Sequence, residues 1–438
     1  MYGWEFPPRI SGGLGVACHA IVNELSKKAI DLTLVLPYSI DNDQIDSHLQ
    51  PTKIKFINVY RESAQSRTNH STNSLGIESG PARLVNILNP YPSLGYTNNN
   101  FDSSSFLSLA FKTIEALHLD SEMASLISNW WYSSKTDTKL IFEVLRYALI
   151  AGRLASSLDY DIIHAHDWLT ILAALEAKFY HSKPVVFHIH ALETDRSGSL
   201  VNQEIYAIEK YGMELADRII AVSHYTKENI IKYYHIDPRK ISVVHNGIYL
   251  PPPTDNHKAA TTSPPMVLFL GRVTHQKGPY FFIQTAKKVL EKKPDTQFVI
   301  AGTGDLLINM IEQVAKLRIG KNVHFTGFLD QTQVKKIYQL ASIYVMPSVS
   351  EPFGLSALEA LSHQVPSIIS KQAGVNEVLN HVLVSDFWDI DDLAGKILAV
   401  LEYQTLGKYL ANHSHSDLKR ISWEEAANKI IDLYQTIL

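Results

Sequence analysis

Residues 345–361 read VMPSVSEPFGLSALEAL, and this stretch decides the expected fold. It continues an apolar run from Ile343 that predicts a buried parallel strand, and a helix is predicted to begin at about Pro352–Gly354. Glu351 and Glu359 lie eight positions apart, a little over two helical turns, so both carboxylates can face one crevice. In open α/β sheets, ligands bind where a strand ends and a helix begins, so this corner is the expected binding site.

The rest of the chain repeats this alternation of strands and helices on both sides of one proline-rich segment. Pro251–Pro253 begins a polar run that ends at Pro264–Pro265, which predicts a linker at residues 251–265. Such alternation is typical of parallel sheets with right-handed crossovers. The expected fold is therefore α/β, with two Rossmann-like domains, residues 1–250 and 266–420, joined by a hinge.

Composition limits the possible classes of protein. The 438 residues exceed one ordinary domain, and 45% hydrophobic with 19% charged residues is typical of a globular protein. A net charge of −4 gives no general attraction to nucleic acid, and the single cysteine excludes an intrachain disulfide framework. No apolar run of about 18 residues predicts an integral membrane segment, and the N-terminus lacks the pattern of a signal peptide. We therefore expect a cytoplasmic enzyme.

A glycine turn at Gly12-Gly13-Leu14-Gly15 is predicted to open the first helix. Its backbone N–H groups could bind an anion such as a diphosphate, although an ordinary glycine turn is the simpler interpretation. A dinucleotide fingerprint fits poorly, because Cys18 occupies the third glycine position. Only Met1–Trp4 precede the turn, so the first strand is predicted to be stunted, or the chain to begin earlier.

A cationic loop, GRVTHQKG at residues 271–278, follows the predicted strand Met266–Leu270. Arg272 can bind phosphate oxygens in a bidentate manner, and Lys277 adds a point charge. Together they could stabilise a departing nucleoside diphosphate without a metal. The alternative is a solvated basic loop with no ligand.

Four histidines lie near the ends of two neighbouring predicted strands: His164 and His166, then His188 and His190. Such a cluster suggests a metal, but Asp167 directly follows His166 and breaks the spacing of the common hydrolase pattern. A hydrogen bond from His166 or His190 to a sugar hydroxyl is the favoured interpretation, and no metal is expected.

The motifs together resemble a known family, the retaining glycosyltransferases of the GT-B fold in the glycogen and starch synthase-like group. The resemblance covers nearly the whole chain. Its most specific part is the spacing of Glu351 and Glu359, which fits the E-x7-E pattern of the family. The motifs that carry it are, in order, WEFPPRISGGLG, HAHDWLT, HIHALETDRSG, VSHYT, VVHNGI, GRVTHQKG, AGTGD, FTGFL and EPFGLSALEAL.

The resemblance implies roles for individual residues. Arg272 and Lys277 would hold the donor diphosphate, Glu351 the transferred sugar, and Glu359 the ribose. His166 would lie near an outer hydroxyl of the sugar. Further donor contacts are implied for Gly12, Gly13, Gly302, Phe353, Gly354, Leu355 and Gly374. Residues 421–438 would form a helix that crosses back to the first domain. Transfer would occur on one face with retention, with no obligate metal and no cofactor, and with ADP- or UDP-glucose as the favoured donors.

Two departures from the family bear on this assignment. Ile10, beside Arg9, stands where bacterial glycogen synthases carry a lysine, which puts ADP-glucose preference in doubt. Ala373-Gly374 replaces the usual double glycine, which could shift one backbone contact.

The leading hypothesis is transfer of a hexose, most readily glucose, to an α-glucan. The first alternative is a mannosyl- or glucosyltransferase for a lipid-linked or exopolysaccharide acceptor, with peripheral membrane contact. The second is an inactive sugar-nucleotide-binding protein, which the joint presence of Arg272, Lys277, Glu351 and Glu359 disfavours. The oligomeric state is not indicated by the sequence.

Overall fold

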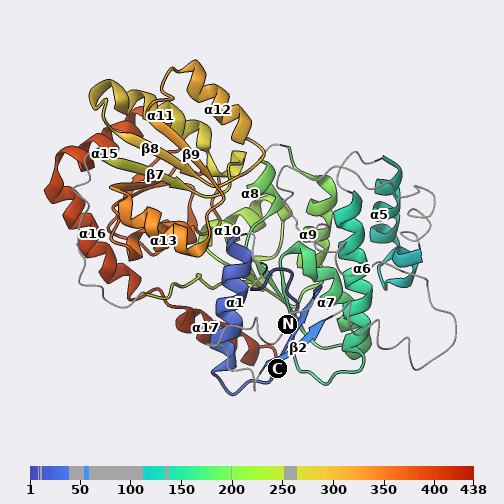
Figure 1. The fold of residues 1–438 in the computed structure, drawn as a ribbon. Helices are drawn as coiled ribbons and strands as arrows, with labels where there is room; N and C mark the ends of the chain where they lie inside the picture. The colour runs from blue at the N-terminus through green and yellow to red at the C-terminus, as the bar shows by residue number, and fades with distance from the viewer. Residues whose placement is uncertain are drawn as a thin grey trace.

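The chain forms two α/β lobes, each built around a parallel sheet with helices packed on it (Figure 1). This computed structural model describes residues 1–7, 9, 12–38, 54–58, 112–133, 138–198, 200–250 and 264–438. The expected fold class, two Rossmann-like units in one chain, is confirmed.

The sheet of the C-terminal lobe has six parallel strands in the order β12-β11-β10-β7-β8-β9. They are β7 (Met266–Leu270), β8 (Gln297–Ala301), β9 (Val323–Gly327), β10 (Ile343–Met346), β11 (Ser367–Ser370) and β12 (Leu383–Ser385). Apolar, largely buried runs of this length form such central strands. The order reverses between β7 and β10, so the carboxyl ends of these two strands border the crevice where doubly wound sheets bind ligands.

In the N-terminal lobe the parallel strands lie in the order β2-β1-β3-β4-β5-β6, with a very short segment at the N-terminus between β1 and β3. Its strands are β1 (Leu32–Leu36), β2 (Ile54–Asn58), β3 (Ile163–His166), β4 (Val185–Ile189), β5 (Arg218–Ala221) and β6 (Ile241–Val243). Tyr2 forms parallel bridges to Val35 on one side and to Ala165 on the other, and so joins β1 to β3. The residues before the glycine turn therefore occupy the position of a first strand.

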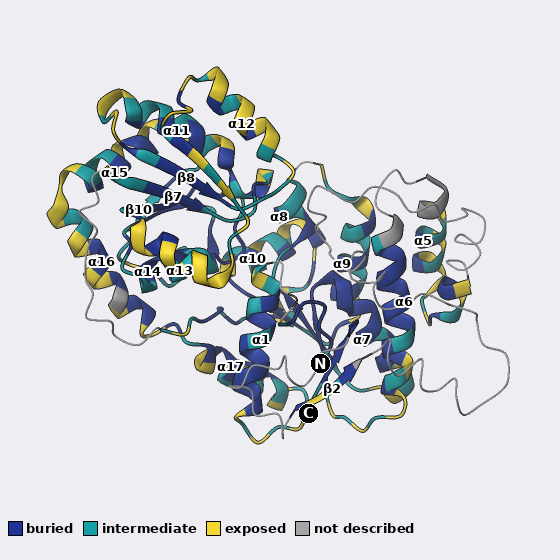
Figure 2. Ribbon diagram, in the orientation of Figure 1, coloured by how far each residue is buried: buried dark blue, intermediate teal, exposed yellow. Residues whose placement is uncertain are grey.

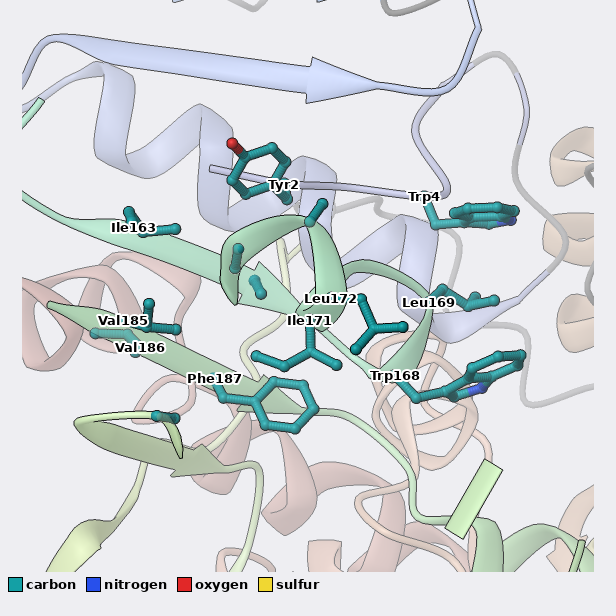
Figure 3. Close-up of a cluster of buried hydrophobic side chains, with 14 of the residues drawn as sticks. Tyr2, Trp4, Ile163, Trp168, Leu169, Ile171, Leu172, Val185, Val186 and Phe187 are labelled. Carbon is teal, nitrogen blue, oxygen red and sulfur yellow. The ribbon is translucent and has the colours of Figure 1, made fainter. Parts of the chain in front are cut away.

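The core of the N-terminal lobe explains why so short a segment stays in place. Trp4 is 1% exposed, and its ring lies edge-on to the ring of Tyr147 at 5.5 Å. The hydroxyl of Tyr147 donates a 2.9 Å hydrogen bond to the carbonyl of Val35. Trp4 and Tyr2 pack over the apolar side chains of β3, β4 and the start of α7 (Figure 3). Burial of two aromatic side chains thus stabilises the segment.

Helices follow most strands, as expected. The N-terminal lobe contains α1 (Gly13–Ser26), α5 (Ser121–Ser133), α6 (Thr138–Ala155), α7 (Trp168–His181), α8 (Glu193–Ser197), α9 (Gln203–Leu215) and α10 (His224–Asn229). The C-terminal lobe contains α11 (Pro279–Lys292), α12 (Leu307–Lys316), α13 (Gln331–Leu340), α14 (Leu355–Ser362), α15 (Ile390–Glu402) and α16 (Gln404–Leu418). No helix of the described part of the chain is long and apolar enough to cross a membrane.

The last helix, α17 (Trp423–Gln435), crosses back and packs against α1 (Figures 1 and 2). Trp423 and Ile430 are buried in the core of the N-terminal lobe. A methyl group on Gly247 would lie 2.1 Å from the Trp423 nitrogen, so only glycine allows this close crossing. The predicted crossover helix is confirmed, whereas the linker at 251–265 lies almost entirely outside the described residues.

The start of α14 differs slightly from the prediction. The helix begins at Leu355, and Gly354 precedes it with φ of 117°. That backbone conformation is readily available to glycine and cannot continue a right-handed helix. The chain therefore turns sharply at Gly354, which separates Glu351 from the helix that carries Glu359.

Candidate active site

The N-termini of α1 and α14, each preceded by a glycine, face each other across the two lobes. A methyl group on Gly13, the first residue of α1, would lie 3.6 Å from Cδ1 of Leu355, the first residue of α14. The residues before them, Gly12 and Gly354, provide no side-chain cap. The first N–H groups of a helix lack partners within it and attract anions. Two helix N-termini thus meet where the topology places the binding crevice.

The cationic loop is held against the neighbouring loop after β8. The N–H of Val273 donates to the carbonyl of Thr303 at 2.9 Å, and Gly271 donates to Ala301 at 2.9 Å. A methyl group on Gly302 would lie only 1.9 Å from the carbonyl oxygen of Gly271. The backbone that carries Arg272 is therefore fixed by a contact that requires glycine.

Lys277 and Glu351 form an ion pair within this crevice. Nζ of Lys277 lies 2.5 Å from Oε2 of Glu351, and the two side chains are only 20% and 8% exposed. Ser348 also donates to Oε2 of Glu351 at 3.3 Å. An ammonium group has three donors, so Lys277 can orient this carboxylate and still bind a phosphate oxygen. The two residues, 74 positions apart, are brought together as the cationic loop and the glutamate motif suggested.

The segment around Glu351 is fixed by the residues that follow β11. The N–H of Glu351 donates to Gln372 at 2.8 Å, and the N–H of Gly374 donates back to Glu351 at 3.0 Å. A methyl group on Gly374 would lie 2.2 Å from the carbonyl oxygen of Pro352 and 2.5 Å from Cβ of Ser223. Gly374 therefore lies between Pro352 of the C-terminal lobe and Ser223 of the N-terminal lobe, in close contact with both.

Glu359, on α14, is a partly buried carboxyl. Its Oε2 accepts a 3.3 Å hydrogen bond from the hydroxyl of Tyr338. Burial raises the pKa of Glu359 from 4.5 to about 6, although the hydrogen bond from Tyr338 opposes this effect. A carboxylate held with few partners is suited to accept hydrogen bonds from ligand hydroxyls.

A pH-dependent stability follows from this raised pKa. The folded protein favours the protonated form of Glu359. The stability gained from this protonation is therefore complete below the unfolded pKa of 4.5 and is lost as pH rises through about 6. At pH 8 the free energy of unfolding of Glu359→Gln should exceed that of the wild type by about 1–2 kcal/mol. Chemical denaturation at pH 4.5 and 8 would measure this gain, which should vanish at the lower pH. A difference that is constant across this range would refute the assignment.

The four histidines form a stack at the ends of β3 and β4, in which His164, His166 and His188 are buried and His190, just past β4, is partly buried. Nδ1 of His166 lies 2.9 Å from Nε2 of His190, and Nε2 of His164 lies 3.3 Å from Nδ1 of His188. Nδ1 of His164 contacts the hydroxyl of Tyr434 on α17 at 2.5 Å. Burial lowers the pKa of His190 to about 3 and holds the pKa values of the other three well below the ordinary value. The stack is therefore neutral at physiological pH.

The geometry of the stack is poorly suited to a metal. Ring nitrogens of His164, His166 and His188 lie within 4.8 Å of one another. The rings, however, lie nearly parallel, with interplanar angles of 20° to 35° and centroids 4.6 to 5.4 Å apart. A metal lies in the plane of each imidazole that binds it, so nearly parallel stacked rings cannot readily share one ion. Nε2 of His166 is buried and has no hydrogen-bond partner among the described residues.

Asp167 holds the ends of β3 and β4 together beside this stack. Its backbone has φ of 56°, and its Oδ1 accepts from the N–H of His190 at 2.6 Å. Burial raises the pKa of Asp167 to about 6, against the opposing charge of Arg196. A non-glycine residue in this conformation is strained, and such strain gathers at functional sites. The sequence suggested no role for Asp167, and its backbone strain could not have been predicted.

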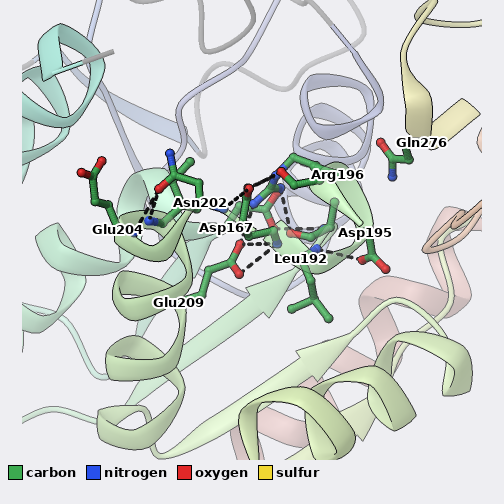
Figure 4. A network of polar contacts seen from close by, with 12 residues as sticks. Asp167, Leu192, Asp195, Arg196, Asn202, Glu204, Glu209 and Gln276 are labelled. Atoms are coloured by element: carbon green, nitrogen blue, oxygen red, sulfur yellow. Dashed lines mark hydrogen bonds and ion pairs between the residues drawn. The ribbon is translucent and has the colours of Figure 1, made fainter. Parts of the chain in front are cut away.

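A polar network surrounds α8 in the N-terminal lobe, and Figure 4 shows Asp195, Arg196 and Glu209 within it. Arg196 donates to Glu209 at 2.6 Å and to Glu193 at 3.2 Å, and burial raises the pKa of Glu209 to about 7. In the same turn, Oδ1 of Asp195 accepts a 2.6 Å hydrogen bond from Ser350, the neighbour of Glu351. The loop after β4 thus contacts the site directly, which the sequence analysis did not anticipate.

Glu377 provides a second contact between the lobes. Its carboxylate accepts from the first N–H groups of α10, those of His224 and Tyr225, at 2.8 Å each. Nε2 of His245 lies 2.7 Å from the same carboxylate. Burial would raise the pKa of Glu377, but these three partners hold it below the ordinary value. An acidic residue capping a helix in the other lobe was missed because a contact between distant segments has no local sequence signal.

Two of the positions discussed in the sequence analysis are not seen as free ligand contacts. Ile10 lies outside the described residues, whereas the guanidinium of Arg9 lies 4.7 Å above the ring of Tyr38. The side chain of Phe353 is 3% exposed and packs in the core of the C-terminal lobe, so only its backbone is available to a ligand.

The fold and the site together define a class: two-lobed enzymes that bind a phosphate-bearing ligand between facing Rossmann-like sheets. Comparison with known proteins identifies the family within this class. Residues 129–250 match the profile of Glycosyltransferase Family 4, and residues 254–416 match that of Glycosyl transferases group 1. The chain belongs to this family of retaining GT-B glycosyltransferases, which transfer a sugar from a nucleotide sugar.

Relatives of the chain carry diverse names. An uncharacterized glycosyltransferase of Methanocaldococcus jannaschii is 30% identical over 296 residues, which is 63% of this chain and 75% of that protein. The glycogen synthase of Mycobacterium tuberculosis is 28% identical over 283 residues (63% and 68%). The phosphatidylinositol N-acetylglucosaminyltransferase gpi3 subunit of Schizosaccharomyces pombe is 28% identical over 289 residues (64% and 62%).

The fold is shared with solved structures. The sucrose-phosphate synthase of Thermosynechococcus elongatus superposes with a TM-score of 0.66 at 18% identity, covering 97% of this chain and 94% of that one. At this identity the likeness concerns the fold alone.

Proposed function

We propose that the protein transfers glucose from a nucleoside-diphosphate glucose, ADP- or UDP-glucose, to an α-glucan acceptor, as a glycogen synthase does. The observation that carries this proposal is the ion pair of Lys277 and Glu351 beside Arg272 and two facing helix N-termini. The similarity to a glycogen synthase over 283 residues supports glucose and glucan as the substrates.

In this proposal the diphosphate lies between the cationic loop and the N-termini of α1 and α14. Arg272, Lys277 and the first N–H groups of these helices stabilise the negative charge that develops on the leaving group. These cations supply the charge without an obligate metal. Gly12, Gly302 and Gly374 contribute by allowing close backbone approach around the donor.

The sugar lies on the other side of Lys277. Glu351 accepts hydrogen bonds from its hydroxyls, and Glu359 accepts from the ribose of the nucleotide. His166, paired with His190, contributes a neutral ring nitrogen toward the sugar when the lobes close. The acceptor attacks from the face that the diphosphate leaves, which retains the α configuration.

The two lobes act as domains in this proposal. Residues 1–250 form the acceptor-side domain, 251–265 the linker, 266–420 the donor domain, and 421–438 the returning helix. The contacts of Ser350 with Asp195 and of Glu377 with α10 fix one relative position of the domains around the donor. Closure there would exclude water that otherwise hydrolyses the donor.

The test is a panel of donors and acceptors. ADP-glucose, UDP-glucose and GDP-mannose are each incubated with the protein and glycogen, and released nucleoside diphosphate and labelled glucan are measured. We expect transfer from at least one glucose donor into glucan, and little from GDP-mannose. Absence of transfer from every donor, with a folded protein, would contradict the proposal.

A lipid-linked acceptor is the second candidate. The similarity to the gpi3 subunit, a phosphatidylinositol N-acetylglucosaminyltransferase component, favours it. In that case the label from the same panel, run with extracted lipid in place of glycogen, would partition into the organic phase. Label in glucan and none in lipid would reject this candidate.

A further inference from the structure

Four aromatic side chains form a partly exposed chain on the surface of the C-terminal lobe. The ring centroids of Tyr280 and Phe281 lie 5.6 Å apart, those of Phe281 and Phe387 4.9 Å, and those of Phe387 and Trp388 4.7 Å, all in edge-to-face contact. Tyr280 is 46% exposed and Trp388 is 55% exposed. We call these four residues the aromatic platform. Exposed apolar patches mark interaction sites, and aromatic side chains are enriched in interfaces.

The platform lies at the carboxyl edge of the sheet, beside the donor site. Tyr280 is the second residue of α11, which begins directly after Lys277 and Gly278. Phe387 and Trp388 lie between β12 and α15, and α11 packs against α15 (Figure 1). Two segments more than a hundred residues apart therefore present one aromatic surface.

A polar link connects the platform to Glu351. The N–H of Glu351 donates to the carbonyl of Gln372, and the side-chain amide of Gln372 donates to Asp386 at 3.2 Å. Asp386 immediately precedes Phe387, and its other oxygen binds Lys371 at 2.7 Å. Polar side chains thus lie between the segment of Glu351 and the aromatic platform.

The charges around the platform favour an uncharged partner. Lys371 is paired with Asp386, and Lys288 of α11 is paired with Asp391. Neighbouring cations are thereby neutralised, so the surface offers no net positive charge to a nucleic acid or to anionic lipid. Aromatic faces carry partial negative charge and pack against the polarised C–H groups of sugar rings, while sugar hydroxyls need side chains such as Gln372 and Asp386.

We propose that the aromatic platform binds a neutral oligosaccharide, namely sugar units of the acceptor chain remote from the reacting end. This inference rests on the proposed function for the identity of the saccharide as an α-glucan, but not for binding itself. Holding a long acceptor at a second place raises its effective concentration at the site. The platform should therefore matter for long acceptors and be irrelevant to the donor.

The test compares Trp388→Ala and Tyr280→Ala with Tyr403→Ala in the full chain. Tyr403 is 61% exposed and follows the far end of α15, about 20 Å along the helix from the platform. Binding is measured without donor, by affinity electrophoresis through glycogen, mannan and a β-glucan and by titration with maltoheptaose. Kd for the saccharide that the wild type binds should rise about 5- to 10-fold in the platform variants and stay unchanged in Tyr403→Ala.

The outcomes separate the platform from the proposed function. Loss of mannan or β-glucan binding in Trp388→Ala supports the platform and rejects α-glucan as the acceptor. Wild-type glucan binding in both platform variants overturns the platform and leaves the proposed function standing. A wild-type dimer that becomes monomeric in Trp388→Ala, with saccharide binding unchanged, also overturns it and identifies a subunit interface. With short acceptors, kcat and the donor KM should not change in any of the three variants.

Discussion

Replacement of Arg272 by alanine should lower kcat for sugar transfer by about 10²- to 10³-fold, because one charged donor to the leaving diphosphate is lost. The backbone on either side of Arg272 is fixed by hydrogen bonds from Gly271 to Ala301 and from Val273 to Thr303. These bonds do not involve the side chain of Arg272. The expected loss is therefore catalytic, with a thermal midpoint close to that of the wild type.

Two further variants serve to interpret this result. Lys277→Ala should also lower kcat strongly, but it leaves the buried carboxylate of Glu351 without its ion pair and should lower stability as well. Lys288→Ala removes an exposed lysine of the same lobe, whose partner is Asp391, and should leave kcat unchanged. Steady-state kinetics and thermal denaturation of all three variants would separate a loss of catalysis from a loss of stability. Near-wild-type activity of Arg272→Ala would show that the diphosphate binds elsewhere.

Replacement of Gly302 by alanine should have the second large effect. The added methyl group would lie 1.9 Å from the carbonyl oxygen of Gly271, and Gly302 has φ of 139°. To relieve this contact, either the backbone of Gly271 and Arg272 or the backbone that follows β8 must shift. We expect the free energy of unfolding to fall by about 2–3 kcal/mol. We also expect kcat to fall by about 100-fold, since a displacement of the order of 1 Å at a catalytic group has that effect.

The matched control is Gly395→Ala. Gly395 lies on the exposed face of α15, and a methyl group there would meet no atom within 4 Å. This variant should be as active as the wild type and more stable by up to about 1 kcal/mol, because alanine favours the helix. Urea denaturation and initial rates measure both variants. If Gly302→Ala kept the stability and rate of the wild type, the loop of Arg272 would not depend on this contact.

The strands and the fold class could be predicted because the relevant information is local. The apolar run Met266–Leu270, bounded by Pro265 and Gly271, predicted β7 with its observed limits, and the run that begins at Ile343 predicted the start of β10. The order of the strands could not be read from the same pattern. The clearest case is Tyr2: its bridges place the short first segment between β1 and β3, and the burial of Trp4 that holds it there has no local sequence signal.

The candidate site could likewise be predicted only in part. Lys277 and Glu351 were expected at one site because the family resemblance implies that Lys277 holds the donor diphosphate and Glu351 the transferred sugar. That they would pair with each other depends on the approach of two loops, which sequence spacing does not encode. Glu377, Asp195 and the strained backbone of Asp167 were missed for this reason: their partners lie in other elements or in the other lobe.

The most direct test of retaining glucosyl transfer is the anomeric configuration of the first product. The wild-type protein is mixed with ADP- or UDP-glucose labelled at the anomeric carbon and with maltoheptaose, and proton and carbon NMR spectra are recorded during the first turnovers. We expect a new labelled α-linked glucosyl unit at the non-reducing end, formed in step with release of the nucleoside diphosphate. A labelled β-linked unit, or release of free glucose with none added to the acceptor, would contradict it.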